Sequence, residues 1–140
     1  MRSSDNSKSL VRRWVTEVWN KGNLAVANDV FAPTYFHRTP AATFPNLEAF
    51  LQMISDFRVA VPDTQVAVQD LFAEDDKVVF RWVLTGTHRG TLFGIAPTNR
   101  AISLSGMTIQ RVENGKIVEA WAEFNAGGLR QHLLGTVGSS

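Results

Sequence analysis

The order of predicted elements indicates an α+β protein, with helices in the first part of the chain and strands in the second. Apolar residues recur at helical spacing before Pro62, and from Asp63 onward they alternate in the manner of β-strands. Asn114 and Gly115, a pair that tolerates positive φ, separate the last two strands and predict a hairpin. Helices followed by a run of strands favour one domain with a mainly antiparallel sheet.

Three helices are predicted. The first extends from about residue 7 to residue 21, with Gly22 as its C-cap, and a short second helix continues through Phe31. Asn46 is a suitable N-cap for the third helix, which Pro62 ends. The residues expected to face the core are Leu10, Val11, Trp14, Val15, Val18 and Trp19 in the first helix and Leu47, Phe50, Leu51, Ile54 and Phe57 in the third.

Five strands are predicted, at residues 35–39, 65–72, 77–87, 101–112 and 116–124. The segment from Gly90 to Arg100 is expected to be a loop or a bulged edge, because Pro97 cannot donate to a sheet ladder. His88, in the glycine-flanked turn before this segment, is expected to serve the loop. Asn125 is expected to cap a terminal helix.

Size and composition indicate a single globular domain. The chain has 140 residues, 44% hydrophobic and 19% charged, so residues 1–140 are expected to form one domain, with residues 1–6 and 136–140 as flexible tails. The net charge of +1 provides no argument for binding to nucleic acid or to an anionic membrane. The chain has no cysteine, which excludes disulfides and thiolate chemistry. Because no apolar run is long enough for a membrane span or a signal segment, a cytoplasmic protein is expected.

The strand at residues 77–87 is apolar on both faces. Val78, Phe80, Trp82 and Leu84 face one way, and Val79, Arg81 and Val83 face the other. Helices in a domain of this size cover only one side of a sheet, so the other side is expected to pack against a second copy in a homodimer. The alternative is that long helix side chains and the C-terminal segment cover it.

The last two strands predict a cavity on the side of the sheet that faces the helices. Ala120 and Ala122 share a face of the final strand and leave volume that larger residues would fill. Thr108 and Gln110 add weakly polar groups on the neighbouring strand. A mostly apolar pocket with a few polar groups is typical of a small-molecule site. The alternative is a tightly packed core in which the small residues accommodate helix aromatics.

Three motifs carry a resemblance to a known family: Gly86-Thr-His-Arg-Gly-Thr-Leu-Phe-Gly-Ile-Ala-Pro-Thr98, Gly115-Lys-Ile-Val-Glu-Ala-Trp121 and Gly128-Leu-Arg-Gln131. From Val11 to about Gly135 the sequence resembles the SnoaL-like polyketide cyclases of the nuclear transport factor two-like superfamily. The resemblance implies a cone-shaped α+β barrel in which three N-terminal helices pack on a curved, mainly antiparallel sheet. It also implies an enclosed pocket and cofactor-free work on hydrophobic carbonyl compounds.

The chain departs from the catalytic pattern that the resemblance implies. Aldol cyclases of this kind use an aspartate on the last strand and a histidine on its hairpin neighbour, and the matching positions are Ala122 and Thr108. Limonene epoxide hydrolases, which share the fold, pair an arginine with an aspartate two residues later. Arg81 is kept here, but the second position is Val83. The resemblance therefore argues against the best-known mechanisms of these relatives.

The remaining polar side chains supply the predicted site. His37 lies mid-strand where the family often has a pocket-facing histidine, and its ordinary pKa suits a catalytic base; the alternative is a histidine with a satisfied hydrogen bond. Arg81 would stabilise an anionic substrate if it faces the pocket, and otherwise it would pair with one of the carboxylates of Asp56, Asp70 or Glu17. The predicted substrate-binding residues are Trp14, Thr108, Gln110, Ala122 and Phe124. No metal-ligand spacing or phosphate-binding loop is present in the sequence, and no cofactor is expected.

The leading functional hypothesis is a dimeric tailoring enzyme that acts on an aromatic polyketide or a similar hydrophobic ketone. Two reactions fit the resemblance, aldol ring closure and hydroxylation, because some SnoaL-like proteins are assigned as hydroxylases of anthracycline-type antibiotics. The lost carboxylate weakens the cyclase hypothesis more than the hydroxylase one. The alternatives are a non-catalytic small-molecule-binding protein on the same scaffold and an interaction module that uses the sheet face.

Overall fold

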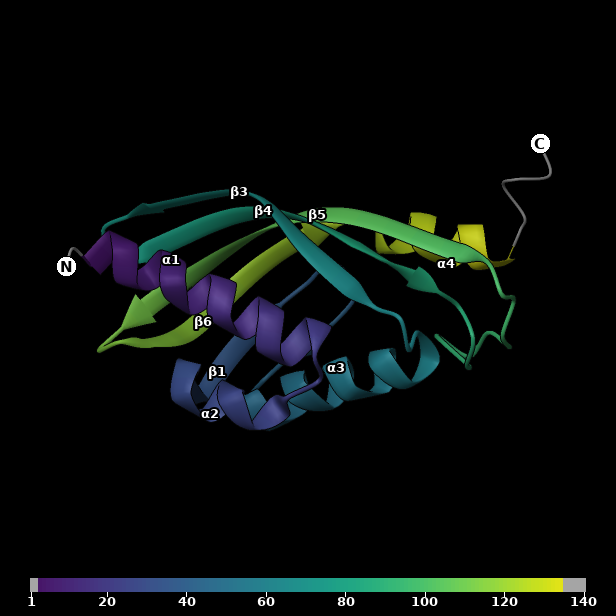
Figure 1. The fold of residues 1–140 in the computed structure, drawn as a ribbon, viewed down its shortest axis with the longest axis horizontal. Helices are drawn as coiled ribbons and strands as arrows, with labels where there is room; N and C mark the ends of the chain where they lie inside the picture. The colour runs from purple at the N-terminus through teal and green to yellow at the C-terminus, as the bar shows by residue number, and fades with distance from the viewer. Residues whose placement is uncertain (1–2, 135–140) are drawn as a thin grey trace.

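A six-stranded sheet that curves over a set of helices forms the frame of the protein (Figure 1). The computed structural model describes residues 3–134. The strand order is β2-β1-β6-β5-β4-β3, in which β1 and β6 are parallel and all other neighbours are antiparallel. The sheet stays open at both edges, and its concave side faces the helices. The predicted α+β cone with a mainly antiparallel sheet is confirmed.

The helices agree with the prediction in place but are more broken. Their bounds are α1 Ser3–Trp14, the π-helix η1 Val15–Asn20, the 3-10 helix η2 Leu24–Val26, α2 Ala27–Val30, α3 Leu47–Ala60 and α4 Ala126–Leu134. The predicted first helix is therefore α1 continued by a π-helical turn. The predicted N-cap of α3 is confirmed, because the Asn46 side chain accepts a hydrogen bond from the Ala49 amide at 2.9 Å.

The strands follow the predicted ones closely. Their bounds are β1 Phe31–Arg38, β2 Thr43–Phe44, β3 Gln65–Glu74, β4 Lys77–Thr87, β5 Ala101–Glu113 and β6 Lys116–Phe124. The prediction starts β1 four residues too late, and it misses β2, which pairs with β1 over two residues. The β5–β6 hairpin turns at Asn114 and Gly115, both with positive φ as predicted.

The concave face of the sheet carries the residues that alternation predicts. Val78, Phe80 and Leu84 of β4 are buried there, together with Ile102, Thr108 and Gln110 of β5 and Ala120 and Ala122 of β6. The start of β6 departs from strict alternation, because Ile117 is fully buried although simple alternation would place it on the face opposite to Ala120 and Ala122. A register shift between Arg111 and Val112 of β5 accounts for the change.

Aromatic rings fill the space between the helices and this face. The Trp14 ring lies edge-on to Phe31, Phe50 and Phe80, with ring centroids 5.1, 6.0 and 6.4 Å away. Tyr35 is fully buried beside Phe31 and Phe50. These contacts tie α1, β1, α3 and β4 into one core, since edge-to-face rings both fill volume and orient one another.

The junction after η1 is fixed by hydrogen bonds to two other elements. The Asn20 side chain accepts from the Val66 amide at 2.6 Å and donates to the Val66 carbonyl at 3.0 Å, which fastens the helix end to β3. The Arg58 guanidinium of α3 donates to the Trp19 and Asn20 carbonyls. Gly22 then turns the chain with a φ of 71°.

The predicted tails fall partly outside the described residues. Residues 3–6 form the start of α1, and the flexibility of the two tails stays a prediction. Residues 1–2 and 136–140 lie outside the described residues. Within residues 3–134, no helix is long and apolar enough to cross a membrane.

Gly106 of β5 sits where any side chain would collide with a tryptophan. A Cβ added there would lie 2.4 Å from Cζ2 of Trp82 and 2.8 Å from the Glu123 carbonyl oxygen. Trp82 therefore lies flat over the glycine, and its own position on the concave face depends on the absence of a side chain at residue 106.

We expect Gly106→Ala to lower the free energy of unfolding by about 1–3 kcal/mol, because overpacking a filled site displaces the indole or the neighbouring strand. Urea unfolding measures this change. Gly127→Ala is the matched control, since the nearest atom to an added Cβ there is Asn125 Oδ1 at 4.0 Å. Equal stabilities of the two variants would contradict the steric account.

Candidate functional site

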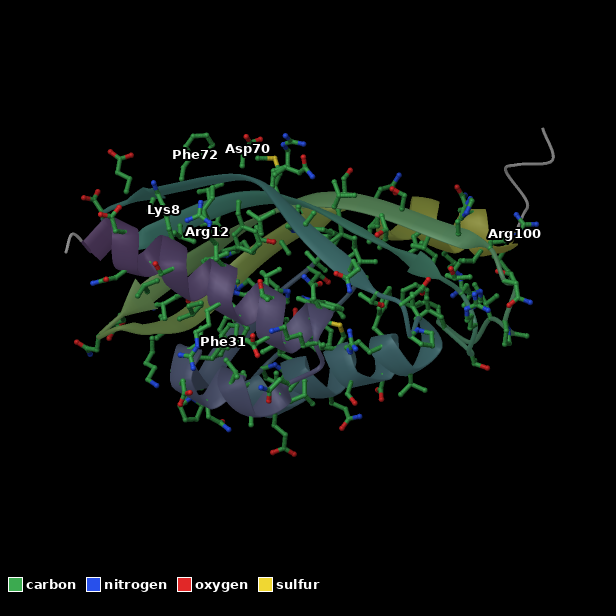
Figure 2. All side chains as sticks on the ribbon, viewed as in Figure 1. Lys8, Arg12, Phe31, Asp70, Phe72 and Arg100 are labelled. Atoms are coloured by element: carbon green, nitrogen blue, oxygen red, sulfur yellow. The ribbon has the colours of Figure 1, made fainter. Side chains whose placement is uncertain are left out.

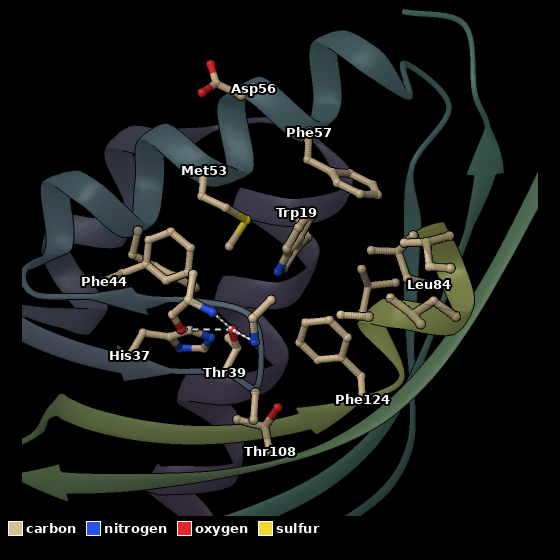
Figure 3. A pocket seen from close by; sticks show the side chains of 18 of the residues that line it. Trp19, His37, Thr39, Phe44, Met53, Asp56, Phe57, Leu84, Thr108 and Phe124 are labelled. Carbon is tan, nitrogen blue, oxygen red and sulfur yellow. Dashed lines mark hydrogen bonds between the residues drawn. The ribbon is translucent and has the colours of Figure 1, made fainter. Parts of the chain in front are cut away.

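A large, mainly apolar cavity lies between the concave face of the sheet and the helices η1 and α3. Its volume is about 890 Å³. Figure 3 shows Trp19, Met53 and Phe57 on its helical side and Leu84, Thr108 and Phe124 on its sheet side. A space of this size and character fits a drug-sized hydrophobic ligand. This geometry is compatible with the expected cavity on the concave side of the sheet.

The loop between β4 and β5 and the start of α4 border the cavity. Leu92 and Phe93 of the loop and Leu129 of α4 contribute to its lining. The Arg130 guanidinium donates to the Phe93 carbonyl at 3.1 Å and so joins the two segments. His88 supports the loop as expected, with Nδ1 2.9 Å from the Thr98 hydroxyl. These contacts hold one wall of the cavity in place.

A row of buried polar groups runs from α1 to the cavity wall. The Trp14 indole N–H donates to Gln110 Oε1 at 3.3 Å, and Gln110 Nε2 donates to the Tyr35 hydroxyl at 3.4 Å. The Tyr35 hydroxyl lies 2.7 Å from His37 Nδ1. We call Trp14, Gln110, Tyr35 and His37 the relay. It ends at the cavity, because the His37 ring is one of the lining groups, beside Phe44 and Thr39 (Figure 3).

Burial sets the charge states of the relay. It lowers the pKa of His37 to about 4, because the imidazolium would lose its hydration, so the ring is neutral at pH 7. Burial also raises the pKa of Tyr35 above its ordinary value, which keeps the phenol protonated. The relay is therefore a network of neutral groups.

Thr108 and Ala122, the two positions at which related cyclases carry catalytic groups, lie side by side. They are register partners on β5 and β6, and both line the cavity. The Trp82 indole donates to Thr108 Oγ1 at 2.9 Å. Because an indole N–H is a donor only, the threonine accepts and its own hydroxyl hydrogen is left for another partner.

Five of the seven sequence-predicted site residues line the cavity: Trp14, His37, Thr108, Ala122 and Phe124. The other two are corrections. Arg81 lies on the outer face of the sheet, where its Nε donates to Asp70 at 2.7 Å, so the expected pocket position is wrong and the structural pairing holds. The cause is the strand period, because Phe80 and Trp82 turn inward and Arg81 between them must turn outward.

Gln110 shares the concave face but does not reach the cavity. It is fully buried behind Trp14 and Tyr35, and both of these residues occupy its amide. The expected direct contact between Gln110 and a substrate is therefore wrong. Its place in the relay gives it an indirect connection to the cavity through Tyr35 and His37.

Sequence reasoning missed several lining residues. Trp82 could have been found, since it shares the alternation of Phe80 and Leu84. Phe44 lies on β2, a strand that the sequence does not predict. Met53 lies in α3 but is not among the residues predicted to face the core. Trp19, which is predicted to face the core, also lines the cavity. Asn125, expected to cap α4, does so by accepting from the Gly128 amide at 2.8 Å.

Among the described residues that line the cavity, Asp56 is the one carboxylate. It is exposed on α3, accepts a hydrogen bond from Gln52 Nε2 at 2.8 Å, and points away from the cavity interior (Figure 3). Across residues 3–134 there is no group of three or more histidine or acidic side chains that could hold a metal ion. The polar side chains of the lining include His37 and Thr108, together with Thr39 and the indole of Trp19.

An open, curved sheet packed on helices, with an apolar cavity between them, is the arrangement of the nuclear transport factor two-like α+β cone. The model of the SnoaL-like polyketide cyclases matches residues 9–133. The chain belongs to the SnoaL-like polyketide cyclase family.

Solved structures of similar proteins agree with this assignment. A protein from Acidithiobacillus ferrooxidans, provisionally described as a polyketide cyclase, is 27% identical, with 96% of this chain and 98% of that chain covered and a TM-score of 0.81. AclR from Streptomyces galilaeus, provisionally described as a hydroxylase, is 27% identical, with coverage of 93% and 96% and a TM-score of 0.82. IdmH from Streptomyces antibioticus, provisionally described as a polyketide cyclase, is 24% identical over 93% and 99% at a TM-score of 0.78 and supports the fold. A search of curated proteins found no significant match.

The lowered pKa of His37 predicts how stability depends on pH. The folded pKa of about 4 is below the ordinary value of 6.5, so protonation favours the unfolded chain. Stability that is present above pH 6.5 should therefore be lost as the pH falls toward 4, at up to about 1.4 kcal/mol per pH unit. Urea unfolding across this range, compared with His37→Gln, isolates the effect from the carboxylates. Parallel pH profiles of the two proteins would refute it.

Proposed function

We propose that the protein is a cofactor-independent tailoring enzyme for hydrophobic, aromatic polyketide-like ketones, acting in the cytoplasm. The observation that carries the proposal is the cavity of about 890 Å³, which is lined mainly by aromatic and aliphatic side chains and presents His37 and Thr108 inside. Membership of a family of polyketide cyclases and similarity to AclR support the substrate class.

The cavity suits chemistry that begins with a substrate whose C–H bond is acidic. The carbon between two carbonyl groups of a polyketide loses its proton readily, so a site without an interior carboxylate can still work on the resulting enolate. Polar groups that hold the enolate oxygen stabilise this anion where its charge develops. His37 and Thr108 would make that contact, and Trp14 and Phe124 would be apolar walls for a flat ring system; the presence of all four in the lining supports these roles.

Two outcomes are compatible with an enolate in this cavity. In aldol closure the carbanion adds to a second carbonyl of the same molecule, and the new alkoxide takes up a proton. In hydroxylation the carbanion adds dioxygen and a proton to give a hydroperoxide, whose reduction to the alcohol consumes two electrons from an external reductant. The alanine at residue 122 favours hydroxylation over closure, because closure in the related cyclases uses a carboxylate at that position.

A panel of aromatic polyketide ketones tests the proposal. We expect some of them to raise the melting temperature and to be converted to products that mass spectrometry identifies. A hydroxylation should add two oxygen atoms from ¹⁸O₂ as a hydroperoxide, or one when a thiol reductant is added, whereas a closure should give loss of water or no mass change. Ala122→Leu should reduce both effects at least severalfold, because it fills space in the cavity. Ala25→Leu, at an exposed position of η2, is the matched control.

A non-catalytic binding protein is the second candidate, favoured by the same lack of an interior carboxylate. Stabilisation of the protein by a ketone without any product would support binding over catalysis. No stabilisation by any ketone of the panel would contradict both candidates. The size of the cavity weakens the third possibility, an interaction module with a packed interior.

We also propose that two copies pair through the outer face of the sheet. An apolar row crosses this face along the registered residues Phe72, Val79, Ile109 and Trp121. Phe72 and Met107 are 66% and 53% exposed, and Figure 2 shows Phe72 and Asp70 projecting from the side of the sheet opposite the helices. The ion pair of Arg81 with Asp70 borders the row. In a symmetric dimer the same patch of each copy forms the interface, so the two apolar rows would pack against each other.

We expect Ile109→Lys to convert the protein to a monomer, because it places a charge in the centre of the apolar row. Light scattering after size-exclusion chromatography measures the mass in solution. Val59→Lys is the matched control, since Val59 is 76% exposed on α3, away from this face. A wild-type protein that is already monomeric at high concentration would contradict the pairing.

A further inference from the structure

The direction of every hydrogen bond in the relay is set by its first member. The indole N–H of Trp14 can donate but cannot accept, so the group of Gln110 that faces it must be the carbonyl oxygen. The amide of Gln110 has two different ends, and its NH₂ therefore faces Tyr35. The side chain of Gln110 cannot be turned over without placing its NH₂ against the indole N–H, donor against donor.

The same logic carries through Tyr35 to His37. The Tyr35 hydroxyl accepts from Gln110 and has one hydrogen to donate, and its neighbour at 2.7 Å is His37 Nδ1. Nδ1 therefore accepts, and the single hydrogen of the neutral imidazole lies on Nε2. Trp14, Gln110 and Tyr35 are each at most 3% exposed, so water does not offer these groups an alternative partner.

The other ring nitrogen of His37 is available to a ligand. No described residue forms a hydrogen bond with Nε2, whereas Nδ1 is occupied by Tyr35. The ring packs against Phe50, with centroids 4.4 Å apart, and this contact limits its rotation. His37 itself belongs to the lining of the cavity, and Nε2 is its one ring nitrogen without a partner among the described residues.

We infer that the relay locks His37 as a hydrogen-bond donor, which presents Nε2–H to a carbonyl or enolate oxygen of the ligand. Trp14, Gln110 and Tyr35 are positioning residues in this assignment. A catalytic base would need an unprotonated nitrogen at the cavity. The role of a hydrogen-bond donor therefore replaces the base role predicted from the sequence. The assignment of the ligand oxygen rests on the proposed function, whereas the assignment of the tautomer does not.

Thr108 gives the cavity a second group of the same polarity. The Trp82 indole donates to its oxygen at 2.9 Å, which leaves the hydroxyl hydrogen of Thr108 to be donated. His37 and Thr108 both project from the concave face, on β1 and β5, with the alanines of β6 between these strands. The site is thus built to recognise acceptor oxygens, as the enol and keto groups of a 1,3-dicarbonyl compound supply them.

Nitrogen-15 NMR of the ligand-free protein tests the tautomer directly. We expect His37 Nδ1 to resonate as an unprotonated and Nε2 as a protonated imidazole nitrogen at neutral pH, with the signals assigned by their loss in His37→Gln. A proton on Nδ1 in the wild-type protein would overturn the inference.

Gln110→Glu should reverse the direction of the hydrogen bond between Tyr35 and His37. An ionised carboxylate accepts from both Trp14 and Tyr35, so the Tyr35 hydroxyl must turn and accept from His37, and Nδ1 gains a proton. Gln69→Glu makes the same change at an exposed position on β3, outside the cavity lining, and should leave the His37 signals unchanged. A ring pattern in Gln110→Glu that stays that of the wild type at every pH at which the variant is folded would also overturn the inference.

Benzoylacetone, an aromatic 1,3-diketone, tests the donor role at a pH at which it is largely its enolate. We expect His37→Leu to weaken its binding by about 10- to 100-fold, as for a lost hydrogen bond to a charged group. His37→Gln should stay within a few fold of the wild type, because a glutamine can accept from Tyr35 and present an N–H to the cavity but cannot act as a base.

Equal losses in the leucine and glutamine variants would overturn the donor role. Wild-type protein that fails to bind benzoylacetone would overturn the assigned ligand oxygen and count against the proposed function. The NMR result would then still decide the tautomer by itself, so the two failures are distinguishable.

Discussion

The indole N–H of Trp14 is the constraint on which the interior of this protein depends. The ring is enclosed by Phe31, Phe50 and Phe80, and a donor buried among aromatic rings costs stability unless an acceptor reaches it. Gln110 supplies that acceptor and thereby ties the first helix to the middle of the sheet. A single requirement for hydrogen bonding thus connects helix packing, sheet register and the polarity of the cavity wall.

The cavity exists because the sheet is lined by small residues where the helices stand off from it. Ala122 of β6 leaves space at the cavity wall, and Gly106 lets the Trp82 ring lie against the strand. Large aromatic residues of η1, α3 and β4 line the cavity and do not fill it. The alanine at residue 122, where related cyclases have a catalytic aspartate, therefore also enlarges the space for a ligand.

Much of the fold follows from the sequence by local rules, whereas the site does so only in part. The cap at Asn46, the turn at Asn114 and the two faces of β4 are set by nearby residues. Period two shows which side chains share a face but not which face meets the helices, and that is why Arg81 could be placed in the pocket. Gln110 lies on the right face, but its depth depends on Trp14, 96 residues away in the chain.

The distribution of tryptophan gives the protein two separate optical reporters. Three of its four indoles, those of Trp14, Trp19 and Trp82, line the cavity. The fourth, Trp121, lies on the opposite face of the sheet beneath the Arg38 guanidinium, which is 4.9 Å from its ring centre. Emission from the first three is sensitive to quenching by an aromatic guest, and emission from the fourth to the polarity of the outer surface. Intrinsic fluorescence can therefore follow cavity occupancy and self-association in the same sample without an added dye.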